Sequence, residues 1–198
     1  MKRLSFLVAA IFAVAAFVSF SSVSAADGLA IGAAMENFKL MDTGGAEKSF
    51  NDLKGKNGAI LIFLSVQCPV VKGYDERIVQ LAADYQAKGI NVIGINSNST
   101  ESLEKVKMHA AENYKFPVLI DKENVLADKL GANTTPEIFY LNEKNVLIYH
   151  GAIDNSRKGD SITENFLRDA VESNLSGKTV AKPSTNAIGC TIKRVAKS

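Results

Sequence analysis

Cys68 is the residue of this 198-residue chain whose type and position are best suited to chemistry. It stands between an apolar run, residues 59–64, and a segment after Pro69 in which apolar residues recur every three or four positions, as in a helix. The start of a helix offers free backbone N–H groups and the positive end of the helix dipole, which favour a thiolate and lower a thiol pKa. Lys72 adds a positive charge nearby. The alternative is a buried, inert cysteine, which is common in proteins.

A second feature is the dipeptide Thr135-Pro136, which directly precedes the apolar run 137–141. Proline is permitted at the first position of a strand, and a cis X-Pro bond is possible there. An ordinary trans proline is the commoner case, because only about 5–6% of X-Pro bonds in folded proteins are cis. The dipeptide therefore marks a strand entrance, and either isomer is open at this point.

The second cysteine, Cys190, lies after Gly189 in a polar C-terminal tail. Exported proteins often pair their cysteines, and two interpretations of this pair stay open. In the first, Cys190 on a mobile tail resolves a mixed disulfide or sulfenic acid formed at Cys68. In the second, a permanent bridge fixes the tail and contributes about 4–5 kcal/mol in the chain-entropy treatment. We favour the redox interpretation, because a structural bridge needs neither a helix start nor a glycine-flanked tail.

Composition and charge exclude several classes of protein. With two Cys and two His, a four-ligand zinc module would consume every soft ligand in the chain, and His109 and His150 have no HxxH spacing. We therefore predict no metal and no cofactor. The net charge is +2, and residues 1–26 contribute Lys2 and Arg3 without any acid, so the remainder is neutral. A neutral chain without a basic cluster is a poor partner for nucleic acid.

Residues 1–26 have the pattern of a secretory signal peptide. A basic start precedes an apolar run, residues 6–18, which is shorter than the roughly 18 residues that a membrane span requires. Small residues, Ser24, Ala25 and Ala26, offer a cleavage site, and an uncleaved anchor is the alternative. We predict an exported protein, periplasmic or secreted, that has no stable membrane anchor after cleavage.

The rest of the chain alternates strand and helix patterns. Predicted strands are residues 59–64, 90–95, 116–120, 137–141 and 146–149, and an N-terminal hairpin joins 38–41 to 48–50. Predicted helices carry the stripes Val71, Tyr74, Ile78, Leu81, Tyr85 and Leu103, Val106, Ala110, the latter capped by Ser99 or Thr100. A short helix at 125–130 ends at Gly131, and a capping box, Ser161 to Glu164, opens the last helix.

This order predicts an α/β fold. The expected architecture is a central mixed sheet, with a parallel core and an antiparallel edge hairpin, flanked by helices and extended by the N-terminal hairpin. Residues 27–177 would form this domain, and residues 178–198 the tail that carries Cys190.

The segment Phe63 to Lys72, after an apolar strand and with Thr135-Pro136 before a later strand, resembles the thioredoxin fold. It is more closely similar to the redoxin group, of the alkyl hydroperoxide reductase and thiol-specific antioxidant type. The similarity covers roughly residues 31–193. Within it, the segments 68–72, 149–154 and 189–193 resemble those of a peroxiredoxin-like subgroup. The resemblance implies that Cys68 is the nucleophile and that Pro136 is a cis-proline facing it.

Two departures from these families limit what the resemblance implies. Val71 occupies the place of the second cysteine of a C-x-x-C motif, so a thioredoxin-style exchange within one helical turn is absent. Leu61 and Ser65 occupy the places of the peroxiredoxin proline and threonine, and Ser65 keeps one hydroxyl near the thiolate. These departures weaken the case for peroxidase activity and leave thiol chemistry in general intact.

The sequence therefore predicts an exported thiol-based oxidoreductase, antioxidant or thiol-disulfide in type. Cys68 attacks a disulfide or peroxide, with Lys72 and Ser65 assisting, and Cys190 resolves the product. Its partner would be a thiol or disulfide protein, or a small peroxide.

Thr135 and Pro136 would shape the groove in which an extended peptide or disulfide partner lies. The rival prediction is a non-enzymatic exported binding module of thioredoxin fold, with a structural disulfide between Cys68 and Cys190. The fold alone does not decide between the two.

Overall fold

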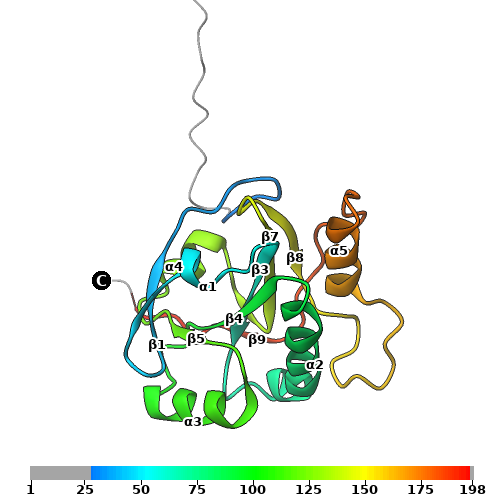
Figure 1. Cartoon of the computed structure of the whole chain (residues 1–198). Coiled ribbons are helices and arrows are strands. Elements are labelled where there is room, and N and C mark those ends of the chain that lie inside the picture. The colour runs from blue at the N-terminus through cyan, green and yellow to red at the C-terminus, as the bar shows by residue number, and fades with distance from the viewer. Residues whose placement is uncertain (1–27, 197–198) are drawn as a thin grey trace, which may run out of the picture.

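The computed structural model describes residues 28–196, so the predicted signal peptide, residues 1–26, lies outside the described residues. The main sheet contains β1 (Lys39–Asp42), β2 (Glu47–Ser49), β3 (Gly58–Leu64), β4 (Ile90–Asn96), β5 (Val118–Ile120), β7 (Glu137–Asn142) and β8 (Leu147–Gly151). A small second sheet pairs β6 (Thr134–Thr135) with β9 (Cys190–Thr191). The helices are α1 (Phe50–Leu53), α2 (Pro69–Gln86), α3 (Leu103–Asn113), α4 (Val125–Leu130) and α5 (Phe166–Leu175) (Figure 1).

The strand order of the main sheet is β2-β1-β5-β4-β3-β7-β8. The central strands β5, β4 and β3 run parallel, and β7 and β8 continue the sheet antiparallel beyond β3. The hairpin β1–β2 adds to the opposite edge, antiparallel to β5. The predicted α/β class and mixed sheet are confirmed, and the N-terminal hairpin becomes part of the sheet itself.

Strand β3 is buried on both faces, as its uninterrupted apolar sequence predicts. Ile60 and Ile62 face a core beneath α2, α3 and α5, whereas Leu61 and Phe63 face a second core beneath α1 and α4. Strand β3 is therefore packed between two apolar layers. This packing fixes the position of the chain where it leaves the sheet towards α2.

Helix α2 begins immediately after Cys68, with Pro69 in its first turn. Its buried residues are Val71, Tyr74, Ile78, Leu81 and Tyr85, which is the predicted stripe. The strands predicted at 59–64, 90–95 and 137–141, and the short helix ended by Gly131, are likewise confirmed.

Two predicted helix starts are wrong. Helix α3 is capped by Ser102, whose hydroxyl accepts a hydrogen bond from the Lys105 N–H, in place of Ser99 or Thr100. Leu103 is therefore in the first turn and is 52% exposed, outside the core. The capping box at 161–164 is also wrong, because α5 begins at Phe166, and the Glu164 N–H donates to the Asn155 side chain in the preceding loop.

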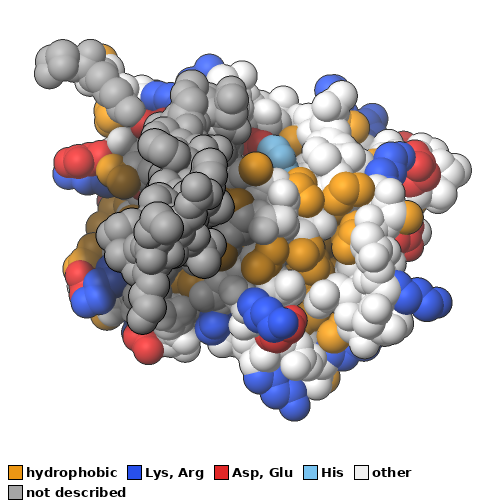
Figure 2. All heavy atoms as spheres, turned by 90° about the horizontal axis from the view of Figure 1, so that it is seen from above, with side chains coloured by type: hydrophobic (Ala, Val, Ile, Leu, Met, Phe, Trp, Pro, Cys, Tyr) orange, Lys and Arg blue, Asp and Glu red, His pale blue; other side chains and the backbone are white. Residues whose placement is uncertain are grey.

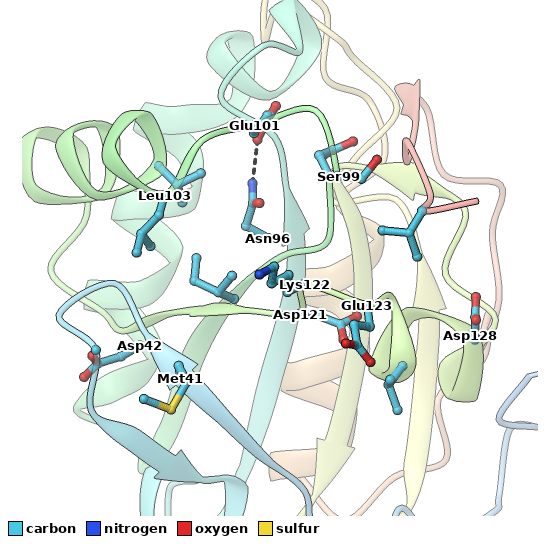
Figure 3. Close-up of a pocket in the computed structure, with 16 residues that line it drawn as sticks. Met41, Asp42, Asn96, Ser99, Glu101, Leu103, Asp121, Lys122, Glu123 and Asp128 are labelled. Carbon is cyan, nitrogen blue, oxygen red and sulfur yellow. Dashed lines mark hydrogen bonds between the residues drawn. The ribbon is translucent and has the colours of Figure 1, made fainter. Parts of the chain in front are cut away.

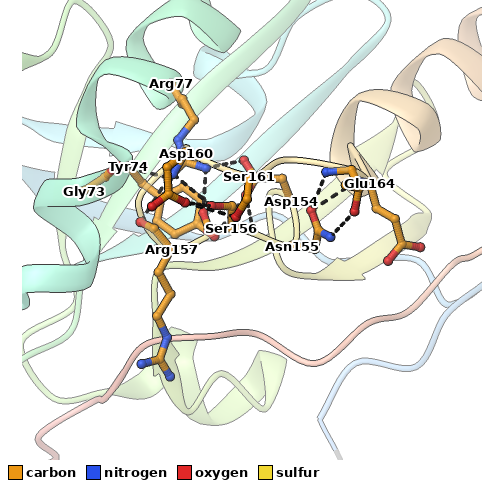
Figure 4. Close-up of polar contacts among 12 residues, drawn as sticks. Gly73, Tyr74, Arg77, Asp154, Asn155, Ser156, Arg157, Asp160, Ser161 and Glu164 are labelled. Atoms are coloured by element: carbon orange, nitrogen blue, oxygen red, sulfur yellow. Dashed lines mark hydrogen bonds and ion pairs between the residues drawn. The ribbon is translucent and has the colours of Figure 1, made fainter.

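The loop between β8 and α5 is held against α2 by the guanidinium of Arg77 (Figure 4). Arg77 pairs with Asp154 at 2.5 Å and also donates to the Ser156 carbonyl oxygen at 2.8 Å. Its other nitrogen donates to the carbonyl oxygens of Gly73 and Arg157, at 3.0 and 3.1 Å. Asp154 is 3% exposed, and Arg77 is the cation that pairs with this buried carboxylate.

The surface carries charges of both signs. Figure 2 shows hydrophobic side chains gathered near the middle of one face, with Lys, Arg, Asp and Glu side chains mostly around the rim of its described part. Within residues 28–196, no helix is long and apolar enough to cross a membrane.

We expect Arg77→Ala to lower the free energy of unfolding by about 3 kcal/mol, because it leaves the buried Asp154 carboxylate without its cation. The matched control is Lys88→Ala, since Lys88 forms an exposed ion pair with Glu172 and its loss costs under about 1 kcal/mol. Urea denaturation of the three proteins measures the difference. Equal losses for the two variants would contradict this role for Arg77.

Candidate functional site

Cys68 sits at the N-cap of α2, one short loop after β3, and is 2% exposed. Its thiol donates a hydrogen bond to the carbonyl oxygen of Thr135, at 3.3 Å. Lys72 is exposed, and its backbone N–H donates to the carbonyl oxygen of Cys68 at 3.3 Å. The two predicted features, Cys68 and the Thr135-Pro136 dipeptide, therefore meet in space.

The peptide bond between Thr135 and Pro136 is cis, as the family resemblance implies. Thr135 is 1% exposed, and its carbonyl oxygen points towards the thiol. The strand that contains it, β6, is only two residues long. Such a short strand needs additional contacts to hold its backbone in place.

Glu137 supplies these contacts, and sequence reasoning missed it. One of its carboxylate oxygens accepts the backbone N–H groups of Asn133 and Thr134, each at 2.7 Å, and the other bonds to His150 Nε2 at 2.7 Å. The ring of His150 also stacks on Phe139, at 4.3 Å between ring centroids. The available signal was an acidic residue placed directly before the apolar residues of a buried strand.

The C-terminal tail, expected to be mobile from its polar sequence, is bound to the rest of the fold over its described residues. Strand β9 pairs antiparallel with β6, which sets Cys190 opposite Thr135. Gly189 passes so close to the Thr135 carbonyl oxygen that an added Cβ would lie 1.9 Å from it, so only glycine fits. Ile192 is 3% exposed and packs into the core beneath α4. Strand pairing and one buried side chain therefore hold the tail.

Residues 183–195, which we call the C-terminal strap, are fastened on both sides of β9. On one side the Thr185 N–H donates to the His150 carbonyl oxygen, at 3.0 Å. On the other side the Lys193 N–H donates to Asn98 Oδ1 at 2.9 Å, and its carbonyl oxygen accepts from the Ser99 N–H at 2.8 Å. The strap thus crosses the site and covers Cys68.

The two cysteines are free thiols, and they contact each other beside the N-terminus of α2. Burial raises the pKa of Cys68, but hydrogen bonds from the Cys190 thiol, the backbone N–H groups of Val71 and Val70, and the Thr135 side chain outweigh it, so this pKa is lowered. Burial raises the pKa of Cys190, and the hydrogen bond to Cys68 and the charge of that thiolate raise it further. The arrangement therefore favours ionisation of Cys68 over ionisation of Cys190.

Ser65 does not reach the thiol, because its hydroxyl donates to Glu101 Oε1 at 2.5 Å. The same carboxylate accepts the backbone N–H groups of Val66 and Gln67 and the Asn96 side chain, at 3.2, 3.0 and 2.6 Å. Glu101, which sequence reasoning also missed, thereby shapes the loop that leads from β3 to the helix start. Within residues 28–196, no group of three or more Cys, His, Asp or Glu side chains is placed to hold a metal ion.

The chain is similar to known proteins in sequence and in fold. The sequence model of the AhpC/TSA family matches residues 31–150. Comparison with curated proteins gives no match. Among solved structures, a hypothetical protein from Sinorhizobium meliloti 1021 is 33% identical with a TM-score of 0.78, over 86% of this chain and 97% of its own.

Two further solved structures extend the comparison. An uncharacterized conserved protein from Geobacillus kaustophilus is 30% identical with a TM-score of 0.80, over 86% of this chain and 95% of its own. The peroxidoxin BcpB from Mycobacterium tuberculosis is 16% identical with a TM-score of 0.58, over 75% of this chain and 95% of its own. The last of these is similar in fold alone.

We expect the reduced protein to be alkylated at Cys68 with a pH midpoint below about 8.5, the value of a free thiol, and at Cys190 with a midpoint above it. The Cys190→Ala variant removes one donor to the thiolate, so its Cys68 midpoint should shift upwards. Iodoacetamide rates between pH 4 and 10, with peptide mapping, measure both midpoints. Reaction of Cys68 only in denaturant, or an unshifted midpoint in the variant, would contradict the assignment.

Proposed function

Because this chain belongs to the AhpC/TSA family, which has a thiol-based redox function, we propose that its own redox chemistry is carried by Cys68 and Cys190. Cys68 is the nucleophile and Cys190 the resolving thiol. The observation that supports this most directly is the contact between the two thiols, with opposite pKa shifts, at the start of α2.

Disulfide exchange is the reaction that these residues support best. The Cys68 thiolate attacks one sulfur of a disulfide R–S–S–R′, forming a mixed disulfide and releasing R′–S⁻. Cys190, after losing its proton to solvent or to the released thiolate, attacks the Cys68 sulfur and expels R–S⁻. The substrate gains two electrons, and the protein keeps a Cys68–Cys190 disulfide, which an external dithiol would reduce.

A small peroxide is the second substrate class. The Cys68 thiolate would attack one oxygen of ROOH, giving Cys68 sulfenic acid and, after protonation, ROH. The Cys190 thiol would then condense with the sulfenic acid, forming the same disulfide and releasing water. Disulfides fit the site better, because the hydroxyl of Ser65, which replaces the peroxiredoxin threonine, is directed to Glu101.

Access to the thiolate depends on the C-terminal strap. Cys68 is 2% exposed, and β9 occupies the open edge of β6 beside it. A protein disulfide would therefore meet the pair only after local displacement of the strap, whereas a small disulfide needs less movement. Thr135 and Pro136 line the place where such a partner would lie.

We expect reduced wild-type protein to release two equivalents of thionitrobenzoate from 5,5′-dithiobis(2-nitrobenzoate) and to end as the internal disulfide. Cys190→Ser should release one equivalent and keep the mixed disulfide at Cys68, because nothing resolves it. Cys68→Ser should release thionitrobenzoate more slowly than the wild type at pH 7, because burial still raises the pKa of the remaining Cys190 thiol.

Absorbance at 412 nm and the intact mass of each product report these outcomes, and circular dichroism checks that each variant is folded. Unchanged kinetics in Cys68→Ser would exclude Cys68 as the nucleophile. If neither thiol reacts until the protein unfolds, the cysteines are structural and the non-enzymatic binding module is the correct description.

We also propose that the protein acts after export. The basic start, apolar run and small residues of the segment 1–26 support this, and cleavage would leave a chain beginning at Ala26 or Asp27. N-terminal sequencing of protein recovered from an expressing bacterium should find one of these two residues. A chain that retains Met1 would contradict cleavage.

A further inference from the structure

A cavity of about 1110 Å³ opens at the carboxyl ends of the parallel strands β4 and β5 (Figure 3). Its walls come from β1, from the first turns of α3 and α4, and from the end of the C-terminal strap. Its volume is slightly above the range of about 300–1,000 Å³ typical of small-molecule pockets. The carboxyl ends of parallel strands are also where open α/β sheets commonly bind ligands. Neither cysteine lines it.

The cavity gathers apolar side chains that are largely exposed. Met41, Leu103 and Val125 are 47%, 52% and 63% exposed, and all three line it. Each comes from a different element, and Figure 3 shows Leu103 of α3 and Met41 of β1 directed into the same space. Exposed apolar side chains that converge on one hollow indicate a binding surface.

Five carboxylates and one cation, Lys122, line the cavity and give it a negative character. Glu101 and Asp121 line it, and both accept hydrogen bonds only from neutral donors. The Asp121 donors are the Ser97 hydroxyl and the first N–H groups of α4. Within residues 28–196, neither carboxylate forms an ion pair. Their charge therefore attracts a cation into a region of reduced solvent exposure.

A buried donor in the cavity wall has no acceptor. Asn98 is 7% exposed and lines the cavity, and its Oδ1 atom accepts the Lys193 N–H at 2.9 Å. Its Nδ2 atom is buried without a hydrogen-bond partner in the described part of the chain. A buried polar group in this state is unfavourable, and a small rotation of the side chain towards the cavity would let an acceptor oxygen of a ligand satisfy it.

We propose that this cavity binds a small amphiphilic amine. The apolar body packs against Met41, Leu103 and Val125, and the ammonium group lies towards the carboxylates of Glu101 and Asp121. An acceptor oxygen on the ligand pairs with Nδ2 of Asn98. The site is independent of the thiol pair, so its test does not depend on redox activity.

Dansylcadaverine provides all three groups, namely an apolar ring system, sulfonamide oxygens and a terminal ammonium. Its matched control is dansyl-6-aminohexanoate, which carries a carboxylate in place of the ammonium. We expect saturable one-to-one binding of the amine to the full folded protein, at least about tenfold tighter than binding of the acid. Dansyl fluorescence measures both titrations, because emission rises and shifts to the blue when the ring leaves water.

The variant pair Leu103→Gln and Met108→Gln localises the binding. Both side chains are on α3 and 52% exposed, but only Leu103 lines the cavity. Leu103→Gln should weaken amine binding at least about tenfold, and Met108→Gln should leave it unchanged. Absence of amine binding, equal affinity for the two probes, or equal effects of the two variants would each overturn the proposal.

Discussion

The pairing of β9 with β6 is the interaction on which the thiol site depends. It joins the end of the chain to the two residues that precede Pro136, and it places Cys190 beside a cysteine at the start of α2. The pairing is short, so its position is fixed by the close passage of Gly189 and by the buried side chain of Ile192. These two residues act together with the hydrogen bonds of the C-terminal strap to hold Cys190 beside Cys68.

Two carboxylates, the buried Glu137 and the half-buried Glu101, organise the loops on either side of this pairing. Glu137 accepts the backbone N–H groups that lead into β6, and Glu101 accepts those of the loop that leads to Cys68. A carboxylate that accepts several N–H groups fixes a backbone without adding a positive charge beside the thiol. Burial raises the pKa of Cys68, and hydrogen bonds from nearby groups lower it by more, so the net shift is downwards.

Glu101 also connects two regions that are otherwise separate. Its oxygens hold the loop before Cys68, and its side chain lines the cavity at the ends of β4 and β5. The cavity and the thiol pair thus share one wall at the carboxyl edge of the sheet, although no cysteine enters the cavity. One edge of the sheet provides both sites, because the loops that follow β3, β4 and β5 meet there.

The sequence by itself determined the alternation of strands and helices, since buried runs such as 59–64 and the stripe of α2 are local apolar patterns. It also identified Cys68 and the Thr135-Pro136 dipeptide, because a helix start and a strand entrance are local features. Only the tertiary structure decided the position of Cys190, the direction of the Ser65 hydroxyl and the roles of Glu101 and Glu137. These depend on hydrogen bonds between segments distant in the chain, and no periodicity or local spacing encodes such contacts.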